Sequence, residues 1–148
     1  MPLYPNLVFL HNNVCIASNV GFVTHDAIHL MLNKKYGGNS FIEHVGVIEI
    51  MDNVFIGSGT RVLYGVRIGS NVIVGSDSLV NKDIPDNSVF AGVPARFICT
   101  FDEYVAKAKE YSEGFKKRYG RESITGIDNQ LSKQIYEHFL EERCHNKE

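Results

Sequence analysis

The sequence repeats with a period of six residues, and this periodicity constrains the fold more than any other feature. Six apolar anchors follow one another at this spacing, and a partner residue stands two positions before each of them. The anchors are Ile50, Ile56, Val62, Ile68, Val74 and Val80, and their partners are Ile48, Val54, Thr60, Val66, Val72 and Ser78. A spacing of two is the period of a β-strand, so each repeat predicts one short strand.

Residues suited to turns form a further column, three positions after each anchor. Its members tolerate a positive φ angle, and they are Asn13, Asn19, Asn53, Gly59, Gly65, Asn71, Asp77 and Asp83. A helix would require a period of 3.6 residues and good helix formers, whereas these segments are rich in Val, Ile, Gly and Asn. Short strands that each end in a bend predict an all-β solenoid with three faces and about 18 residues per coil.

The repeats form two blocks that are out of phase with each other. The earlier block contains Val8 and Leu10, Val14 and Ile16, and Val20 and Phe22. The separation between Phe22 and Ile50 along the chain is not a multiple of six. An excursion over about residues 24–45 must therefore leave the solenoid. Its two lysines and two glycines predict an exposed loop, and a long loop in a compact domain is usually functional or disordered.

The repeats give way to a different pattern after Val80. The segment IPDNSVFAGVPARFI contains two prolines, which cannot donate to a strand ladder, and it predicts the end of the solenoid. Thr100 and Glu103 form a capping box ahead of a helical pattern, and a second helix is expected from Asp128 to about Arg143, after a linker at 119–126. We therefore expect a β domain over residues 1–98 and a helical tail over residues 99–148.

Composition excludes several classes of protein. The 15 Lys and Arg against 17 Asp and Glu give a net charge of −2, which offers no general attraction for nucleic acid. Cys15, Cys99 and Cys144 form no CxxC pair, so neither a disulfide framework nor a cysteine zinc site is predicted. The sequence has no secretory leader pattern and no sustained apolar run long enough to span a membrane. We expect a cytoplasmic protein without a membrane span.

Four motifs in a fixed order give the sequence a family resemblance. Anchor-glycine pairs such as Ile56-Gly57, a loop that contains Thr-His, the run VNKDIPDNSV and then AGVPAR resemble the galactoside, maltose and capsular-polysaccharide O-acetyltransferases over roughly residues 8–98. The resemblance implies a left-handed parallel β-helix of hexapeptide repeats that assembles as a homotrimer. It also implies an enzyme that moves an acetyl group from acetyl-CoA to a hydroxyl of a sugar or polysaccharide.

The resemblance also assigns roles to individual residues. His25 takes the position of the general base, and an imidazole with an ordinary pKa of about 6.5 suits that role. The backbone N–H of Ser58 takes the oxyanion position, which makes Ser58 both a catalytic and a CoA-binding residue. The remaining assignments are Ser76 along the pantetheine arm, Lys82 and Arg96 near the nucleotide end of CoA, and His29 as a contact of the acceptor or merely an exposed loop residue.

Several interpretations stay open beside this one. On sequence alone, His25 is a loop histidine, Ser58 is a solenoid corner, and Lys82 and Arg96 are solvated charges. A zinc enzyme resembling γ-class carbonic anhydrase would require three histidines around the metal, for which His25, His29 and His44 supply the number. A third hypothesis is a non-catalytic repeat scaffold. We expect no metal ligands, and no cysteine nucleophile because direct attack requires no covalent intermediate.

Overall fold

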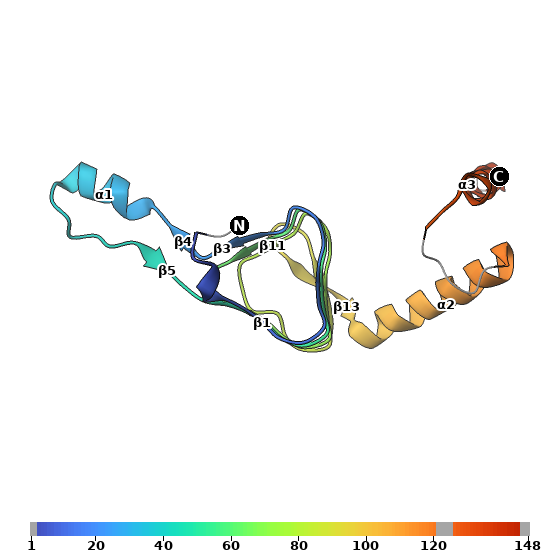
Figure 1. Cartoon of the computed structure of the whole chain (residues 1–148), viewed down its shortest axis with the longest axis horizontal. Coiled ribbons are helices and arrows are strands. Elements are labelled where there is room, and N and C mark those ends of the chain that lie inside the picture. Colours follow the sequence, from blue (N-terminus) through green and yellow to red (C-terminus); the bar gives the residue numbers. More distant parts are fainter. Residues whose placement is uncertain (1–2, 121–125, 146–148) are drawn as a thin grey trace. The chain divides into compact units, whose positions relative to one another are not determined.

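Three mostly parallel sheets form the sides of a triangular coil, which Figure 1 shows end-on. The computed structural model describes residues 3–120 and 126–145. After the short helix η1 (Pro5–Leu7), sheet A contains β1 (Val8–Leu10), β6 (Ile48–Ile50) and β9 (Val66–Ile68). Sheet B contains β2 (Val14–Ile16), β7 (Val54–Ile56), β10 (Val72–Val74), β12 (Ser88–Ala91) and β13 (Arg96–Thr100); sheet C contains β3 (Gly21–Val23), β8 (Arg61–Leu63) and β11 (Leu79–Val80). The predicted parallel solenoid is confirmed.

The core of the solenoid lies where the period of six places it. All the inward residues predicted for the second block are buried, and the largest contributions come from isoleucines such as Ile50, Ile56 and Ile68, which are fully buried. The first block is less covered, since Leu10 and Ile16 are 48% and 40% exposed. The inward side chains of the first coil are therefore less buried than those of coils that have a neighbouring coil on each side.

One corner of the coil is lined by a ladder of asparagines. Asn13, Asn53, Asn71 and Asn87 all have a positive φ between 53° and 58°. Each of the first three donates its side-chain amide to the side-chain oxygen of the next, at 2.9, 3.1 and 2.9 Å. The predicted corner residues all have a positive φ except Asp83. The prediction for Asp83 was wrong, because the corner between β11 and Ile84, where Asp83 lies, has two residues fewer than the corresponding corner of the preceding coil.

The last coil is shorter than the others, which explains this difference. Between β6 and β9 the register pairs Ile48 with Val66, whereas between β10 and β12 it pairs Val72 with Ser88, so the last coil has two residues fewer. The prediction that the repeats end after Val80 was also wrong, since β12 continues sheet B in parallel with β10. The solenoid ends at β13, which pairs with β12 in the antiparallel direction and extends to Thr100, past residue 98.

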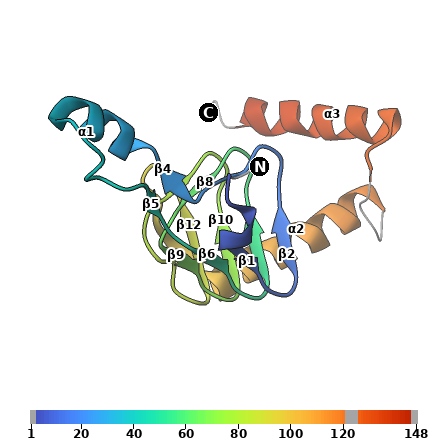
Figure 2. The same cartoon turned by 60° about the vertical axis from the view of Figure 1, so that its left-hand side comes forward.

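The excursion leaves the triangle at the corner where sheets C and A meet (Figure 1). The two ends of the excursion meet where the Gly46 N–H donates to the Thr24 carbonyl at 3.0 Å. After the excursion the chain returns to the solenoid as β6, which pairs with β1. The expectation of a loop was wrong in part. The excursion carries an antiparallel pair, β4 (His25–Asp26) and β5 (His44–Val45), and the helix α1 (Ile28–Tyr36), visible in Figure 2.

Two helices follow the solenoid. The predicted capping box is confirmed: Thr100 Oγ1 accepts the Glu103 N–H, and the Glu103 carboxylate accepts the Thr100 N–H. Helix α2 spans Phe101–Tyr119, and α3 spans Asn129–His145 and begins with the Asp128 carboxylate accepting the Leu131 N–H. Of the predicted linker, residues 121–125 lie outside the described residues. The chain divides into compact units at 1–105 and 106–148. Among the described helices, none is long and apolar enough to cross a membrane.

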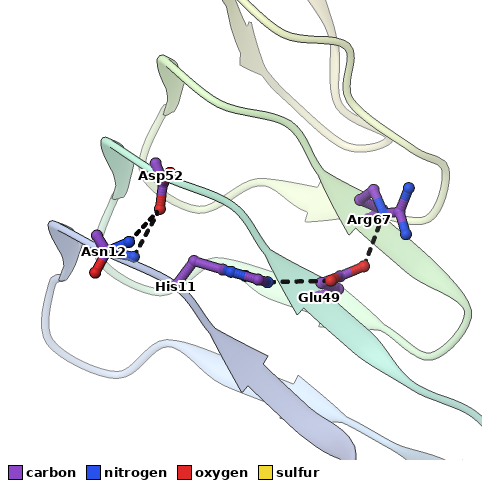
Figure 3. Close-up of polar contacts among 5 residues, drawn as sticks. All are labelled: His11, Asn12, Glu49, Asp52 and Arg67. Carbon is purple, nitrogen blue, oxygen red and sulfur yellow. Dashed lines mark hydrogen bonds and ion pairs between the residues drawn. The ribbon is translucent and has the colours of Figure 1, made fainter.

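A polar cluster joins three coils on the outer side of sheet A (Figure 3). Glu49 lies between His11 and Arg67, with contacts of 3.1 Å to the His11 Nε2 and 2.8 Å to the Arg67 Nε. Beside it, the Asp52 carboxylate accepts the backbone N–H of Asn12 at 2.8 Å and the side-chain amide of Asn12 at 3.0 Å. These contacts hold the pKa of both carboxyl groups below the usual values, with the His11 contact as the main cause for Glu49.

The lowered pKa of Glu49 predicts an acid-dependent contribution to stability. A carboxyl group with a lower pKa in the folded state stabilises the fold above its unfolded pKa of about 4.3 and loses that effect as pH falls through the folded pKa. We therefore expect wild type and Glu49→Gln to differ in melting temperature at pH 6 and to converge as the pH falls below about 4. Thermal unfolding between pH 3 and 6 measures this. A constant difference across that range would contradict an ionic role for Glu49.

Candidate active site

His25 lies at the root of the excursion, where the chain has just left β3. The antiparallel register of β4 and β5 sets His25 opposite Val45 and Asp26 opposite His44. Neighbouring residues of a strand point to opposite faces, so His25 and Asp26 face away from each other. The excursion thus has two faces, and His25 occupies one of them.

The face of His25 also carries Glu43 and Tyr4. The Nε2 of His25 lies 3.9 Å from the Glu43 carboxylate, and the Tyr4 ring meets the imidazole edge-on at 5.3 Å between centroids. The Tyr4 hydroxyl donates to the other oxygen of Glu43 at 2.7 Å, and this bond raises the pKa of Tyr4. Among the described residues, the buried Nδ1 of His25 has no hydrogen-bond partner. The arrangement suits a histidine base with a carboxylate near one of its ring nitrogens.

Neither Glu43 nor Tyr4 was identified from the sequence. Both lie outside the hexapeptide pattern, and Glu43 is separated from His25 in the chain by the whole of α1. The pairing of β4 with β5 brings Glu43 back to His25, whereas the sequence predicts only a loop in this region. The sequence therefore contained no signal for this contact.

The opposite face carries Asp26, His44 and Tyr64. The Tyr64 hydroxyl donates to Asp26 at 2.7 Å, and His44 Nδ1 lies 3.9 Å from the same carboxylate. Because His25 and His44 lie on different faces, the three histidines of the zinc hypothesis do not converge on one point. Among the described residues, no group of three or more His, Cys, Asp and Glu side chains is placed to hold a metal ion.

Ser58 and Ser76 lie in one column at the opposite end of sheet C, where it meets sheet B. The Asp77 N–H donates to the Ser58 carbonyl at 2.7 Å, and the Gly59 N–H donates to the Ser18 carbonyl one coil earlier. Within the described part of the chain, the N–H groups of Ser58 and Ser76 have no backbone acceptor. Each of these two coils therefore presents one backbone N–H without an acceptor at this corner. The N–H of Ser58 is one of a column of such groups.

Glycine allows the two turns to stack this closely. A Cβ atom at Gly57 would lie 2.5 Å from the Ser76 nitrogen and 2.8 Å from the Gly75 carbonyl carbon. Only a residue without a side chain fits between these backbones. The position of the Ser58 N–H thus depends on the glycine that precedes it.

The two predicted basic residues lie at different ends of sheet C. Arg96 begins β13 and is exposed, next to Ala95, whose N–H donates to the Leu79 carbonyl at 2.9 Å. Lys82 is exposed in the short corner between β11 and Ile84, which bridges to Ile68 in sheet A. Arg96 is therefore near the end that carries Ser76, and Lys82 is near the end from which the excursion leaves.

The predicted site residues consequently form two groups within one chain. His25, His29 and Lys82 lie at or beyond one end of sheet C, and Ser58, Ser76 and Arg96 lie at the other. The length of β3 (Gly21–Val23) separates the corner at Ser18, one coil before Ser58, from the excursion root at His25. One chain does not bring the base and the free N–H together.

Comparison with known proteins identifies the family. The family model described as bacterial transferase hexapeptide (six repeats) matches residues 48–82. Protein CapG of Staphylococcus aureus is 38% identical over 132 residues, which cover 89% of this chain and 75% of CapG. A galactoside O-acetyltransferase of Lactococcus lactis is 55% identical over 89 residues, 59% of this chain and 40% of that protein.

A solved structure has the same architecture. A galactoside acetyltransferase in complex with coenzyme A superposes with a TM-score of 0.57 and 32% identity, over 82% of this chain and 53% of that one. Apart from CapG, the chain thus spans about half or less of these related proteins. The identity to CapG over three quarters of its length and the shared solenoid place this chain in the hexapeptide-repeat acetyltransferase family.

Proposed function

We propose that the chain is an acetyl-CoA-dependent O-acetyltransferase that acts on a hydroxyl group of a sugar or polysaccharide. The observation that carries the proposal is the presentation of His25 at the excursion root, with the Glu43 carboxylate 3.9 Å from its Nε2. The relatives named above include galactoside O-acetyltransferases, and one solved relative holds coenzyme A. A left-handed sense of the coil belongs to the same proposal, because it follows from the family resemblance.

The proposed reaction is a direct transfer in which His25 moves the proton. The imidazole takes the proton of the acceptor hydroxyl as that oxygen bonds to the thioester carbonyl carbon, and Glu43 stabilises the resulting imidazolium. The Ser58 N–H donates to the oxyanion of the tetrahedral intermediate. When this intermediate collapses, the carbon–sulfur bond breaks, the acetyl ester remains on the acceptor, and His25 returns the proton to the thiolate of CoA. No step requires a cysteine.

The donor site fits an extended thioester. Acetyl-CoA supplies the activated acetyl group, and the free N–H groups of Ser58 and Ser76 lie one coil apart on a single column. Such a column suits successive carbonyl groups of a thioester and a pantetheine arm. Arg96 lies beyond Ser76 and is exposed, so its guanidinium is available to a phosphate.

Separation of the two groups within one chain supports an active site that is shared between copies. We propose a homotrimer, as in the implied family assembly, in which the excursion of one copy brings His25 to the Ser58 corner of the next. Lys82 of one copy and Arg96 of another would then reach the same CoA.

Sedimentation tests the assembly. We expect a species of three chains at micromolar concentration, because the few full coils of one chain form a small core and association contributes to stability. As a functional counterpart, mixing the inactive variants His25→Ala and Gly57→Ala under exchange conditions should restore activity, since some shared sites receive both intact groups. A stable monomer with full activity would exclude a shared site.

The basic residues give a test of donor binding. Lys82→Ala and Arg96→Ala should each weaken binding of CoA more than binding of dephospho-CoA if the side chain contacts the 3′-phosphate. Loss of one charge-assisted contact costs about 1.5–3 kcal/mol, or roughly ten- to a hundredfold in Kd. Calorimetric titration of both ligands measures the difference. Lys34→Ala, in the exposed last turn of α1, is the control. Equal losses for the two ligands would indicate structural roles.

The identity of the acceptor is the least determined part of the proposal. His29 extends into the excursion beyond His25, and we propose that it contacts the acceptor. Release of CoA thiol from acetyl-CoA should be measured with galactosides, glucose-type sugars, sialic acid, amino sugars and capsule repeat units. At least one sugar should accelerate thiol release well above the rate of hydrolysis. Absence of both CoA binding and turnover across this panel would favour a non-catalytic scaffold.

A further inference from the structure

A pocket of about 410 Å³ lies within the excursion, on the side of the β4–β5 pair that faces away from His25. We name it the excursion pocket, and its lining includes Asp26, His29, Leu32, Ser40, Phe41 and His44. Its volume falls in the range of small-molecule sites, about 300–1,000 Å³. Strand alternation separates it from the proposed base, since Asp26 and His44 are paired residues on one face and His25 lies on the other.

The polar groups of the pocket define what it can bind. The Asp26 carboxylate is fixed by the Tyr64 hydroxyl and by the Ile28 N–H, which together lower its pKa. It therefore presents a negative charge that disfavours phosphate and carboxylate ligands. His44 is 66% exposed beside it. Among the described residues, the buried Nδ1 of His29 has no hydrogen-bond partner.

The apolar part of the lining is held in place. Phe41 lines the pocket, and Asn33 of α1 fixes its backbone through two hydrogen bonds, accepting the Phe41 N–H at 3.0 Å and donating to the Phe41 carbonyl at 2.8 Å. Leu32 extends the apolar surface from the same helix. A carboxylate and imidazoles that line one pocket together with a fixed aromatic ring match a neutral ring compound with hydroxyl groups on its edge and C–H groups on its face.

We propose that the excursion pocket binds a neutral sugar unit of the acceptor other than the unit that is acetylated. Hydroxyl groups of this sugar would donate to Asp26 and bond to the imidazoles of His29 and His44, while its apolar face packs on Phe41. A sugar held here cannot present a hydroxyl to His25 of the same chain, because the β4–β5 pair lies between them. The inference rests on the proposed function for its role, and it specifies the acceptor as an oligosaccharide or polysaccharide.

Direct binding without acetyl-CoA tests the pocket. The imidazole C–H signals of His29 and His44 in the full-length protein are followed by NMR during titration with galactose, lactose and maltotriose, and separately with phosphate and zinc chloride. We expect at least one of the three sugars to shift both signals. Phe41→Ala and His44→Gln should each raise the Kd of that sugar at least tenfold, and Lys34→Ala should leave it unchanged. The second variant guards against a fold defect in the first.

Each outcome bears on one of the two proposals. Shifts caused by phosphate or zinc but by none of the sugars would overturn the sugar site, and so would sugar affinities that both variants leave unchanged. Thiol release is measured in parallel with the same compounds. Sugar binding without any turnover would contradict the proposed activity and leave the pocket standing. The ratio of kcat/KM for a disaccharide to kcat/KM for a monosaccharide should fall in both variants relative to wild type. If the protein turns over sugars but this ratio is unchanged in both variants, the sugar site is contradicted and the proposed activity is not.

Discussion

Replacement of His25 by alanine is expected to lower kcat by roughly 10²–10⁴-fold and to leave the affinity for CoA close to wild type. The imidazole is proposed to accept a proton only as the acceptor attacks, so its loss removes an interaction of the transition state. Steady-state kinetics with the best sugar acceptor measure the first part, and calorimetric titration with CoA measures the second.

Two further variants make this result specific. Glu43→Gln retains the size of the side chain but removes the charge near His25, so kcat should fall less than in His25→Ala. His11→Ala removes a histidine from the outer side of sheet A, outside the proposed site, and should retain the wild-type kcat. If His25→Ala keeps the wild-type kcat, His25 is an ordinary residue of the excursion and the proposed mechanism is wrong.

Gly57→Ala is expected to lower the free energy of unfolding more than any other glycine-to-alanine change at the corner between sheets B and C. The new Cβ would lie 2.5 Å from the Ser76 nitrogen, and a backbone held in strand ladders on both sides cannot move away easily. Over-packing of this kind costs about 3 kcal/mol at the upper end of its usual range. Chemical denaturation of wild type and variant gives the difference in free energy of unfolding.

Ser58→Ala is the matched control for Gly57→Ala. It changes the adjacent residue, which is exposed, and it keeps the backbone N–H that is proposed to bind the oxyanion. Stability and kcat should therefore both stay near wild type. A large loss of kcat in Ser58→Ala would show that the hydroxyl acts in catalysis. Wild-type stability of Gly57→Ala would mean that the coils are not packed as closely as described.

The positions of the strands were predictable from the sequence because the inward residues recur every six residues, with two inward positions per strand. Ile50 and Val62 are buried for the same reason as their neighbours, since the side-chain period of a strand and the length of a coil side are both fixed. Corners were predictable wherever the coil kept its regular length. The prediction of a positive φ at Asp83 failed because the last coil is shorter than those before it. The preceding repeats contain no sign of this change in coil length.

Pairing inside the excursion could not be predicted in the same way. Helix α1 contains helix formers such as Leu30 and Lys34, but with an unknown partner surface its short apolar pattern was indistinguishable from a loop. The contact between His25 and Glu43 depends on an antiparallel register that only the folded excursion defines. Local periodicity therefore located the proposed base, and tertiary pairing supplied its neighbours.

The reversed direction of β13 has a consequence for how copies of this chain can stack. A parallel solenoid with two open ends is a template for end-to-end growth, because the last strand of one copy can pair with the first strand of the next and the contact repeats without closing. In sheet B the last strand is antiparallel to the ladder beneath it, so a first coil docked there would pair with it in the antiparallel direction and would not continue the parallel ladder. The terminal strand thus interrupts the parallel ladder that regular end-to-end growth along the axis would have to continue.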